Sequence, residues 1–235
     1  MEFETWEPVY EAILEEFGFD RTADERSRDR AVDLAQQFSF DRLSWIDGAT
    51  VAIVGAAPTL PDELGRLDGV DGRIAASTAV DVLDAYGYST DLMVTDLDKN
   101  TETAIDRTHL GRPVVAHAHG DNLPAVTEWF PRADTEHVLA TTQAEPRGPV
   151  YNFGGFTDGD RAAFLADAFG ADRLVFVGWQ FGDPSVDPLK RRKLQWAARL
   201  LEWLEQRRND RFELLDGHRE SIDSVPLGFD SVNSG

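Results

Sequence analysis

Short apolar runs rich in Val, Ile, Leu and Ala alternate with helix-length amphipathic segments from residue 50 onwards. Runs of this length are typical of buried strands, and their alternation with helices favours a mostly parallel sheet with helices on both faces. The sequence therefore predicts an α/β fold, in which ligands bind beyond the carboxyl ends of the strands. The predicted strands are residues 51–54, 73–76, 92–94, 113–116, 138–140, 174–177 and 212–215.

Apolar residues also recur at helical spacing in two segments before the first strand, residues 6–17 and 24–38. We expect these helices to form a small N-terminal helical appendage over residues 1–46. The α/β domain then spans residues 47–220, and residues 221–235 form a C-terminal tail. A chain of 235 residues is long enough for one main domain with a sizeable core.

The charge balance is strongly acidic, with 43 Asp and Glu residues against 23 Lys and Arg residues, a net charge of -20 and only three lysines. An acidic, lysine-poor surface remains hydrated in concentrated salt, so we interpret the composition as halophilic. Docking of a basic partner is the alternative, but the acidic residues are spread along the chain rather than gathered in a tail. The same field repels nucleic acid, so we expect no nucleic-acid partner.

Cysteine usage and hydropathy indicate the compartment. The chain has no cysteine, its first residues lack the pattern of a signal peptide, and no apolar stretch is long enough to span a membrane. We therefore expect a cytoplasmic protein with no membrane partner.

Two carboxylates, Asp96 and Asp98, follow the third predicted strand directly after Thr95. Residues two apart in a strand point to the same face, so we expect both carboxylates to project together where the strand ends. Like charges this close raise each other's pKa unless a cation neutralises them. The pair favours Mg²⁺, which prefers a few carboxylates plus substrate phosphates. A solvated turn is the alternative.

Small residues follow the first predicted strand. A turn of such residues brings backbone N–H groups close to a phosphate at a helix start. Many strand-to-helix turns need small residues for steric reasons alone, so both interpretations stay open for this loop. The loop matches neither a Walker loop nor a dinucleotide-binding fingerprint. It consists of Gly55, Ala56, Ala57, Pro58 and Thr59.

The fourth predicted strand leads into His117, His119, Asp121 and Asn122. An HxH pair can ligate a transition metal, which would indicate a metal-dependent hydrolase, or it can contact a substrate or its phosphates. A purely structural role is the third alternative. No other histidine is clustered with this pair in the sequence, so substrate contact is the favoured interpretation.

A loop rich in glycine and polar residues precedes a predicted helix that begins near residue 161. The glycines permit positive φ, and either Thr157 or Asp158 is a suitable helix cap. A capped helix start beside a glycine loop favours anion binding. The candidate ligand-binding residues here are Asn152, Gly154, Gly155, Thr157, Asp158, Asp160 and Arg161.

The sixth predicted strand leads into Trp179, and a basic cluster at residues 190–193 follows. The cluster holds two of the three lysines of the chain. Basic residues at a helix start oppose the helix dipole, at a cost of a few tenths of a kcal/mol unless an anion offsets it. The cluster therefore favours polyphosphate binding over a solvated basic turn. Its residues are Lys190, Arg191, Arg192 and Lys193.

Six motifs, taken in order, resemble those of the archaeal 6-hydroxymethyl-7,8-dihydropterin pyrophosphokinases of the MptE type. The resemblance covers about residues 48–216, and the middle part is similar to the catalytic domain of thiamine pyrophosphokinases. Trp179, Gln180 and Phe181 replace the Met-Asp-Phe more usual in the family, and a glutamine cannot balance the charge of a metal. The motifs are residues 55–60, 95–98, 117–122, 152–161, 178–182 and 190–193.

The resemblance implies transfer of a diphosphate from ATP to the hydroxymethyl oxygen of the pterin, with release of AMP, in folate-type or methanopterin-type cofactor biosynthesis. Asp96 and Asp98 would then hold Mg²⁺. Lys190 and Lys193 would act on the phosphate oxygens together with the arginines between them, and the two glycine-containing loops would bind nucleotide or diphosphate. The residues expected to orient the pterin are His117, His119, Asp121, Asn122 and Trp179.

Other classes remain open on the residues alone. A metal-dependent phosphohydrolase would use the HxHxD group, and a thiamine pyrophosphokinase-like enzyme would share the metal site but not the substrate. A non-catalytic nucleotide-binding protein is the third class. The expected partners are small molecules, and a homo-oligomer is compatible with the sequence. No residue is assigned as a general base, because transfer to an alcohol can depend on positioning and metal.

Overall fold

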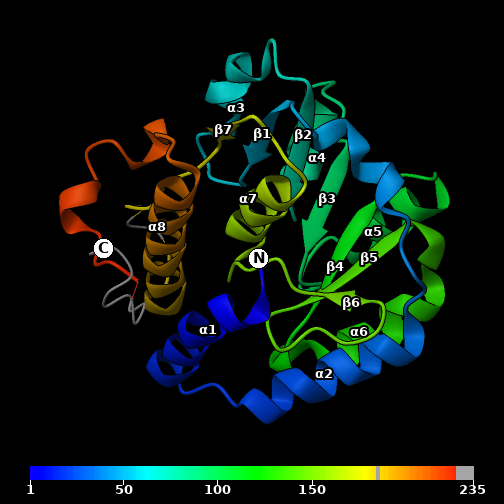
Figure 1. The fold of residues 1–235 in the computed structure, drawn as a ribbon. Helices are drawn as coiled ribbons and strands as arrows, with labels where there is room; N and C mark the ends of the chain where they lie inside the picture. Colours follow the sequence, from blue (N-terminus) through cyan, green and yellow to red (C-terminus); the bar gives the residue numbers. More distant parts are fainter. Residues whose placement is uncertain (184–185, 226–235) are drawn as a thin grey trace.

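The structure, a computed structural model, describes residues 1–183 and 186–225. Its strands form one seven-stranded sheet in the order β6-β5-β4-β3-β2-β1-β7, and each neighbouring pair is parallel (Figure 1). The predicted α/β fold with a parallel sheet is therefore confirmed. The strands are β1 (Thr50–Val54), β2 (Gly72–Ala76), β3 (Leu92–Thr95), β4 (Val114–Ala118), β5 (Val138–Thr142), β6 (Val150–Tyr151) and β7 (Arg173–Val177).

Helices cover both faces of this sheet. The α-helices are α1 (Phe3–Phe17), α2 (Arg21–Leu34), α3 (Leu60–Glu63), α4 (Ala79–Ala85), α5 (Thr101–His109), α6 (Leu123–Trp129), α7 (Asp158–Ala168) and α8 (Pro188–Arg208). The 3-10 helices are η1 (Phe40–Ile46), η2 (Leu64–Leu67), η3 (Gly120–Asn122), η4 (Phe130–Arg132), η5 (Thr135–His137), η6 (Glu213–Leu215) and η7 (Arg219–Ser221).

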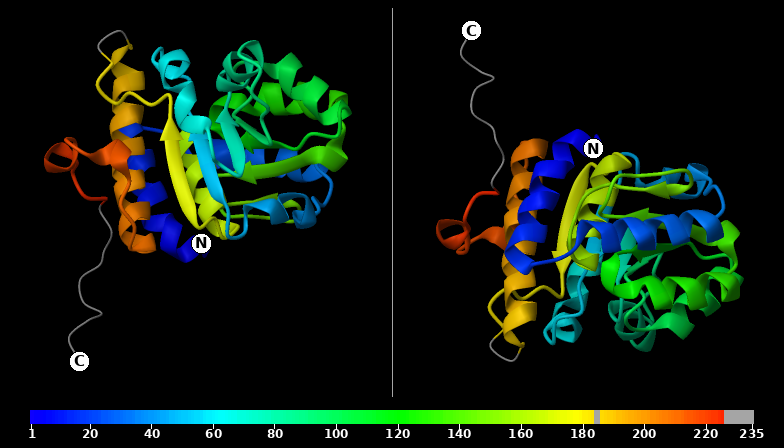
Figure 2. Two further views of the ribbon diagram at one scale, coloured as in Figure 1. Left: turned by 90° about the horizontal axis from the view of Figure 1, so that it is seen from above. Right: turned by 90° about the horizontal axis from the view of Figure 1, so that it is seen from below.

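The two faces of the sheet are buried in two separate apolar clusters. Val51 and Ile53 of β1 pack with residues of α1, α7 and α8, whereas Ala52 and Val54 pack with residues of α3, α4, α5 and α6. This alternation follows the two-residue period of a strand. Both views of Figure 2 show α1 and α8 together beside β7.

The chain reverses its direction across the sheet at β1. Strands β2 to β6 are added one after another on one side of β1. Helix α7 then returns across β3, β2 and β1, on the face of the sheet opposite to α3, α4, α5 and α6. Strand β7 finally pairs with the other side of β1. The neighbouring strands β1 and β7 therefore lead to helices in different apolar clusters, α3 and α8. Such a reversal opens a crevice at the carboxyl edge, where ligands bind in open α/β sheets.

The first two helices contribute to the body of the fold. Trp6, Val9 and Ile13 of α1 belong to the same apolar cluster as one face of the sheet. Helix α2 contacts α6, η3 and the strands β4 and β5. Residues predicted as an N-terminal appendage thus reach the carboxyl edge of the sheet.

Two details of the predicted sheet were wrong. The run at 212–215 is not a strand: residues 213–215 form η6, with Phe212 and Leu215 buried against α8. The Phe212 N–H donates to the Glu205 carboxylate instead of a neighbouring strand. The two-residue strand β6 was not predicted, because Val150 and Tyr151 are too few to give a periodic pattern.

The C-terminal part of the chain is described as far as Val225, which is buried against the apolar cluster of α8. Residues 226–235 of the predicted tail lie outside the described residues. Within the described residues, no helix is both long and apolar enough to cross a membrane.

Candidate active site

Asp96 and Asp98 meet through a turn rather than along a strand. Strand β3 ends at Thr95, whose hydroxyl accepts a hydrogen bond from the Leu97 N–H at 3.0 Å. Leu97 is 3% exposed and has φ of 63°, a left-handed conformation that is costly for a branched side chain. With Leu97 turned into the core, the Asp98 N–H donates to Asp96 Oδ1 at 3.3 Å, and the two carboxyl groups lie close enough to shift each other's pKa. Strand alternation was therefore the wrong reason for their proximity.

Three acidic groups interact in this part of the site. Partial desolvation raises the pKa of Asp98 to about 6, and its interaction with the neighbouring Asp96 carboxylate adds to this effect. Burial, followed by repulsion from Asp96, raises the pKa of Asp158 well above its ordinary value, although Arg161 and Lys190 oppose the shift. Burial also opposes ionisation of Asp96, but the bond with Asp98 and the charge of Arg161 outweigh it and lower its pKa. Asp96 therefore carries the negative charge most readily.

This donor set suits a metal that takes part of its coordination from a substrate. In residues 1–183 and 186–225, no group of three or more His, Cys, Asp or Glu side chains is arranged to hold a metal ion by itself. The Asp96–Asp98 pair nevertheless fits Mg²⁺, which commonly takes one or two carboxylates and completes its shell with water and phosphate oxygens. The mutual repulsion of the two carboxyl groups is the kind that a cation relieves.

The two histidines that follow differ in their surroundings. His117 is 2% exposed on β4, its Nδ1 lies 3.1 Å from the Thr141 hydroxyl, and its Nε2 has no partner among the described residues. Burial, reinforced by the charge of Arg161, lowers the pKa of His117 well below 6.5. His119 lies just beyond the strand with its Nε2 3.9 Å from Asp96 Oδ2, and burial lowers its pKa as well. Both imidazoles are thus better suited to hydrogen bonding than to carrying positive charge.

Asn122 joins the ends of β3 and β4. Its amide nitrogen donates to the carbonyl oxygens of Asp96 at 2.6 Å and His117 at 2.7 Å, while its Oδ1 accepts from the His119 N–H at 2.9 Å. The Asn122 side chain is therefore hydrogen-bonded within the protein, and it connects the loop after β3 to the loop after β4. Asp121, one residue earlier, is exposed at the edge of the site.

The loop before α7 divides into structural and site-facing residues. Thr157 and Asp160 form a capping box, and Asp160 also accepts from the Phe156 N–H at 2.6 Å. Asn152 donates to the carbonyl oxygens of residues 143 and 144 and accepts from the Gly154 N–H. Gly154 and Gly155 have φ of 92° and 91°. These are the positive values that we expected glycine to permit in this loop.

Arg161 and Asp158 lie in the first turn of α7, and their charges act on Asp96 of the β3 loop, which is residues 96–100. Arg161 Nη1 lies 3.2 Å from Asp158 Oδ1, and the Arg161 charge acts on Asp96, His117 and His119. The Arg161 Nε is buried and has no partner among the described residues. The Arg161 guanidinium is therefore a buried positive charge that acts on residues after both β3 and β4.

The loop after β1 packs against the loop after β7. The Ala57 N–H donates to the Gly178 carbonyl at 3.0 Å, and Glu63 accepts from both the Gly178 N–H at 3.0 Å and the Thr59 hydroxyl at 2.6 Å. Trp179 donates its indole N–H to the Ile53 carbonyl at 3.0 Å. Ala56 and Pro58 are exposed on this loop.

The basic cluster lies in the first turns of α8, as predicted, but its side chains point in different directions. The Asp187 carboxylate caps the helix by accepting from the Lys190 N–H at 2.9 Å, and the Lys190 charge acts on Asp98 and Asp158. Lys193 Nζ lies 5.7 Å from the centre of the Phe156 ring. Of the basic residues 190–193, Lys190 is thus the one whose charge acts on Asp98 and Asp158.

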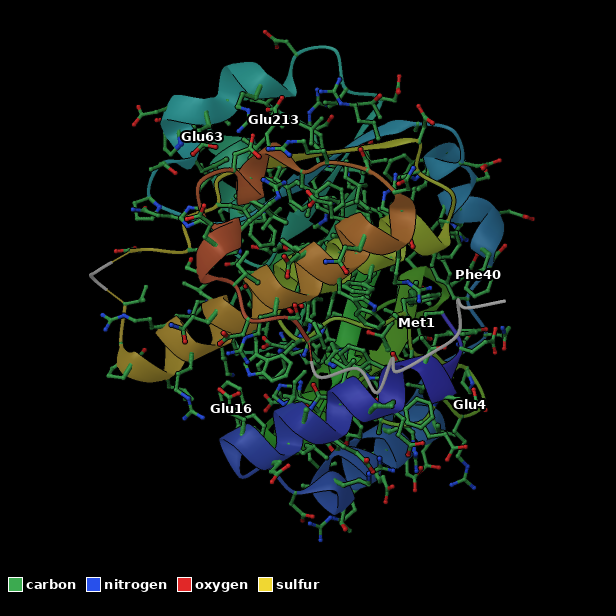
Figure 3. All side chains as sticks on the ribbon, turned by 60° about the vertical axis from the view of Figure 1, so that its left-hand side comes forward. Met1, Glu4, Glu16, Phe40, Glu63 and Glu213 are labelled. Carbon is green, nitrogen blue, oxygen red and sulfur yellow. The ribbon has the colours of Figure 1, made fainter. Side chains whose placement is uncertain are left out.

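The two arginines of the cluster have other contacts. Arg192 donates to the Glu16 carbonyl at 2.6 Å, and its guanidinium lies 4.5 Å from the centre of the Phe17 ring. Figure 3 shows Glu16 at the end of α1, near the start of α8. Arg191 Nη2 lies 3.5 Å from the Val186 carbonyl. In this structure Arg192 ties α8 to the end of α1.

Sequence reasoning missed three residues that support the site, Tyr10, Asp24 and Gln143. Asp24 is buried on α2 and accepts hydrogen bonds from the other two side chains. The signal available in the sequence was helical spacing, because Asp24 shares the buried face of α2 with Ser27, Arg28 and Ala31. An acidic residue on the inner face of a helix indicates a buried hydrogen-bond network.

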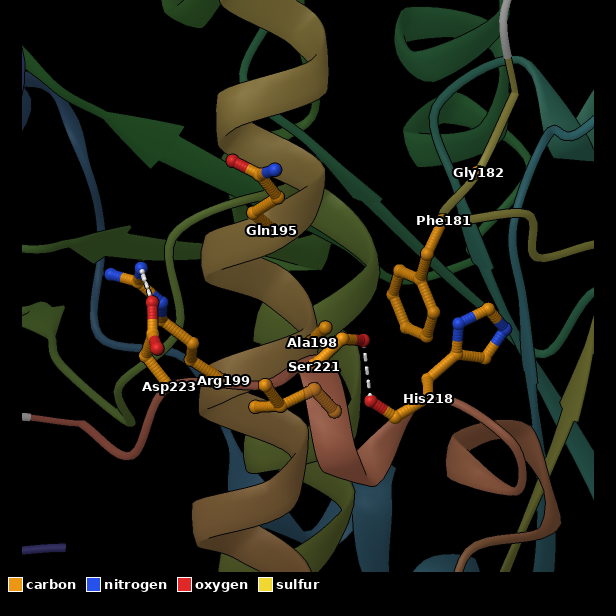
Figure 4. Close-up of a pocket in the computed structure, with 9 residues that line it drawn as sticks. Phe181, Gly182, Gln195, Ala198, Arg199, His218, Ser221 and Asp223 are labelled. Carbon is orange, nitrogen blue, oxygen red and sulfur yellow. Dashed lines mark hydrogen bonds and ion pairs between the residues drawn. The ribbon is translucent and has the colours of Figure 1, made fainter.

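Two pockets in the described part of the chain differ in their relation to the site. A small cavity among His117, Thr141, Phe153, Gly154 and Arg161 adjoins the candidate site. A larger pocket of about 290 Å³ lies between α8 and the C-terminal segment, with Arg199 paired to Asp223 and Ser221 bonded to His218 on its wall (Figure 4). None of the predicted site residues lines the larger pocket.

Comparison with known proteins relates this geometry to a family. Residues 26–185 match the family model described as 6-hydroxymethylpterin diphosphokinase MptE-like. The chain belongs to the MptE-like family. The match contains the β3 loop, the start of α7 and residues 117–122, here called the histidine loop.

Three curated relatives of this chain carry the name 6-hydroxymethyl-7,8-dihydropterin pyrophosphokinase. The protein from Methanothermobacter thermautotrophicus is 39% identical over 91% of this chain and 99% of its own. The protein from Pyrococcus furiosus is 40% identical over 92% of this chain and 99% of its own. The protein from Methanocaldococcus jannaschii is 30% identical over 88% of this chain and 97% of its own. The similarity therefore extends through nearly the whole length of these relatives.

Proposed function

We propose that this chain transfers a diphosphate group from ATP to the hydroxymethyl oxygen of 6-hydroxymethyl-7,8-dihydropterin, producing AMP and the pterin diphosphate. The observation that carries the proposal is the convergence of Asp96, Asp98 and Asp158 with Arg161 and Lys190 at the carboxyl edge of the sheet. This arrangement occurs in a member of the MptE-like family whose relatives carry the name of this activity.

Diphosphate transfer needs charge compensation and alignment more than covalent chemistry by the protein. Arg161 and Lys190 would place fixed positive charge beside the phosphate chain. Asp96 and Asp98 would hold Mg²⁺, which when bound neutralises phosphate oxygens and orients them for attack. In the Gly55–Thr59 loop the N–H groups of Gly55 and Ala57 are bonded to the carbonyl oxygens of Val177 and Gly178, and a proline has no N–H. The loop would therefore contribute phosphate contacts through Ala56 and Thr59.

The pterin would be recognised from the histidine loop. His119 and Asp121 offer a ring nitrogen and a carboxylate at the edge of the site, and a pterin presents paired donors and acceptors. Asn122 would contribute by holding this loop, since its amide is bonded within the protein. Trp179 would contribute only through its ring, because its indole N–H is bonded to Ile53.

The direct test is to incubate the protein with ATP, Mg²⁺ and 6-hydroxymethyl-7,8-dihydropterin in molar KCl and to measure AMP and the pterin diphosphate. We expect both products in equal amounts, and their loss when EDTA removes Mg²⁺. Asp96→Asn and Asp98→Asn should each lower kcat by about 100-fold or more, because each removes a charge that compensates the metal. Circular dichroism should show that both variants remain folded.

The alternatives give different products. A phosphohydrolase would release phosphate or diphosphate without the pterin, and a thiamine pyrophosphokinase-like enzyme would form AMP only with thiamine. A folded protein that forms no AMP from the pterin mixture in either high or low salt would contradict the proposed function.

A further inference from the structure

Helix α2 brings a buried carboxylate, Asp24, to the back of the candidate site. Asp24 is 3% exposed, and its helix is far in sequence from the loops that form the candidate site. Gly120 lets α2 approach, because a Cβ atom at Gly120 would stand 2.8 Å from the Cβ of Ala23 and 3.3 Å from the Asp24 backbone nitrogen. The contact between α2 and the histidine loop therefore depends on a residue without a side chain.

Three donors from three separate segments converge on the Asp24 carboxylate. The Gly120 N–H donates to Oδ1 at 2.5 Å, and the Tyr10 hydroxyl and the Gln143 amide nitrogen donate to Oδ2 at 2.7 and 2.8 Å. Among the described residues, no Lys or Arg side chain forms an ion pair with Asp24. The buried carboxylate is thus held by hydrogen bonds from three separate segments.

Asp24 also decides which way the Gln143 amide faces. An ionised carboxylate only accepts hydrogen bonds, so the NH₂ group of Gln143 must point to Asp24 and its Oε1 must point away. On that side, Arg161 Nη2 lies 3.4 Å from Gln143 Oε1. The Gln143 backbone carbonyl is held independently, by the Trp6 indole at 2.8 Å and by Asn152 at 3.0 Å. The side chain of Gln143 therefore relays the position of Asp24 to Arg161.

We infer that Asp24 is a positioning residue for the proposed diphosphate transfer: it holds the Arg161 guanidinium through Gln143 and the histidine loop through Gly120. The inference rests on the proposed function and extends the site into α2. Asp24 itself touches neither the candidate metal ligands nor the cavity beside His117. Its effect on the reaction would be exerted through the two groups it holds and through its charge, which also acts on His119.

A polarity swap tests this relay. In Asp24→Asn the new NH₂ group faces the NH₂ group of Gln143, so Arg161 loses the acceptor on Gln143 and keeps the one on Asp158. We expect kcat per folded molecule to fall about tenfold or more. In Gln143→Glu two carboxylates face each other, and we expect a similar loss. In the double variant, the introduced asparagine donates to the introduced glutamate, whose second oxygen accepts from Arg161. We expect kcat to return to within about threefold of the parent.

Tyr10→Phe is the matched control. It removes one donor to the same carboxylate but leaves the bonds to Gly120 and Gln143 in place. We expect its unfolding midpoint to fall while kcat per folded molecule stays within about threefold of the parent. Folded fractions are measured by chemical unfolding in the assay salt, so that a loss of stability is not counted as a loss of turnover.

Binding of inorganic pyrophosphate, measured by calorimetry, provides a readout that does not depend on the pterin reaction. We expect weaker binding in Asp24→Asn and recovery in the double variant. An unchanged kcat and pyrophosphate affinity in Asp24→Asn would overturn the inference, as would a double variant no better than the single ones. If the parent forms no pterin diphosphate, the proposed function fails, and the pyrophosphate series still decides whether Asp24 positions Arg161.

Discussion

Gly55 and Gly178 are in close backbone contact just beyond the ends of β1 and β7. A Cβ atom on Gly55 would stand 2.6 Å from the Gly178 carbonyl oxygen, and a Cβ atom on Gly178 would stand 2.5 Å from the Gly55 carbonyl oxygen. These two strands lead to helices in different apolar clusters, so the contact lies at the base of the crevice where we expect phosphates to bind. The distance between the two loops is therefore set by the absence of side chains.

Substitution of Gly55 by Ala should push these loops apart. The new Cβ would meet a backbone carbonyl, which has little freedom to move, so we expect a loss of about 1–3 kcal/mol in the free energy of unfolding and a higher KM for ATP. Gly65→Ala is the control, because a Cβ there meets nothing within 4 Å. Urea unfolding and steady-state kinetics measure the two effects. Equal stability of the two variants would show that the loops tolerate separation.

Lys190 and Arg192 of the basic cluster have different contacts, so we expect the Lys190→Ala variant to lose activity and the Arg192→Ala variant to lose stability. Lys190→Ala removes a charge that acts on Asp98 and Asp158, so we expect kcat/KM for ATP to fall about tenfold or more with little change in stability. Arg192→Ala removes the contacts with Glu16 and Phe17, so we expect about 1 kcal/mol less stability and a smaller kinetic effect. The prediction fails if Arg192→Ala has the larger effect on turnover.

His117 predicts a pH dependence of stability. Burial lowers its pKa well below 6.5, so the unfolded chain takes up the proton first as the pH falls. The stabilising effect of the neutral imidazole is therefore present above about pH 6.5 and is lost below it, at up to about 1.4 kcal/mol per pH unit for one proton. We expect His117→Asn to reduce this slope between pH 6.5 and the onset of acid unfolding. Urea unfolding at a series of pH values checks this, and parallel curves for parent and variant would contradict it.

The net charge of -20 predicts that stability depends on salt. Repulsion among the carboxylates opposes the compact state and weakens as salt screens it. We expect the melting temperature to rise by about 10 °C or more between 0.2 and 3 M KCl. A variant with Asp62, Asp68 and Glu128, all exposed, replaced by Asn or Gln should need less salt. A melting temperature independent of KCl would contradict the halophilic interpretation.

Several parts of the fold followed from local pattern. Buried strands such as Val51–Val54 and Leu174–Val177 were recognisable because both faces are covered, which gives short apolar runs. A cap at Thr157 or Asp158 was recognisable from residue type, and the structure selects Thr157, with α7 beginning at Asp158 rather than near residue 161. These signals reach only a few residues along the chain, which is the range over which sequence patterns are reliable.

Other parts depended on contacts between distant segments. The run 212–215 has an apolar composition suited to a strand, but the Glu205 carboxylate binds its first N–H and no sheet edge is used. Asp96 and Asp98 were paired for the wrong reason, because the packing of Leu97 into the core produces the turn. Neither outcome is visible in the spacing of residues.

The sequence by itself determined the class of fold, the strand ends at which the polar motifs lie, and the resemblance that points to pterin diphosphate transfer. Only the tertiary structure decided which side chains of those motifs face one another: Arg161 and Lys190 act on the acidic groups, while Arg192, Asn152 and Asp160 are bonded elsewhere. It also brought Asp24 to Gln143, 119 positions apart. Local periodicity specifies the elements, but the pairing of buried polar groups depends on how those elements pack.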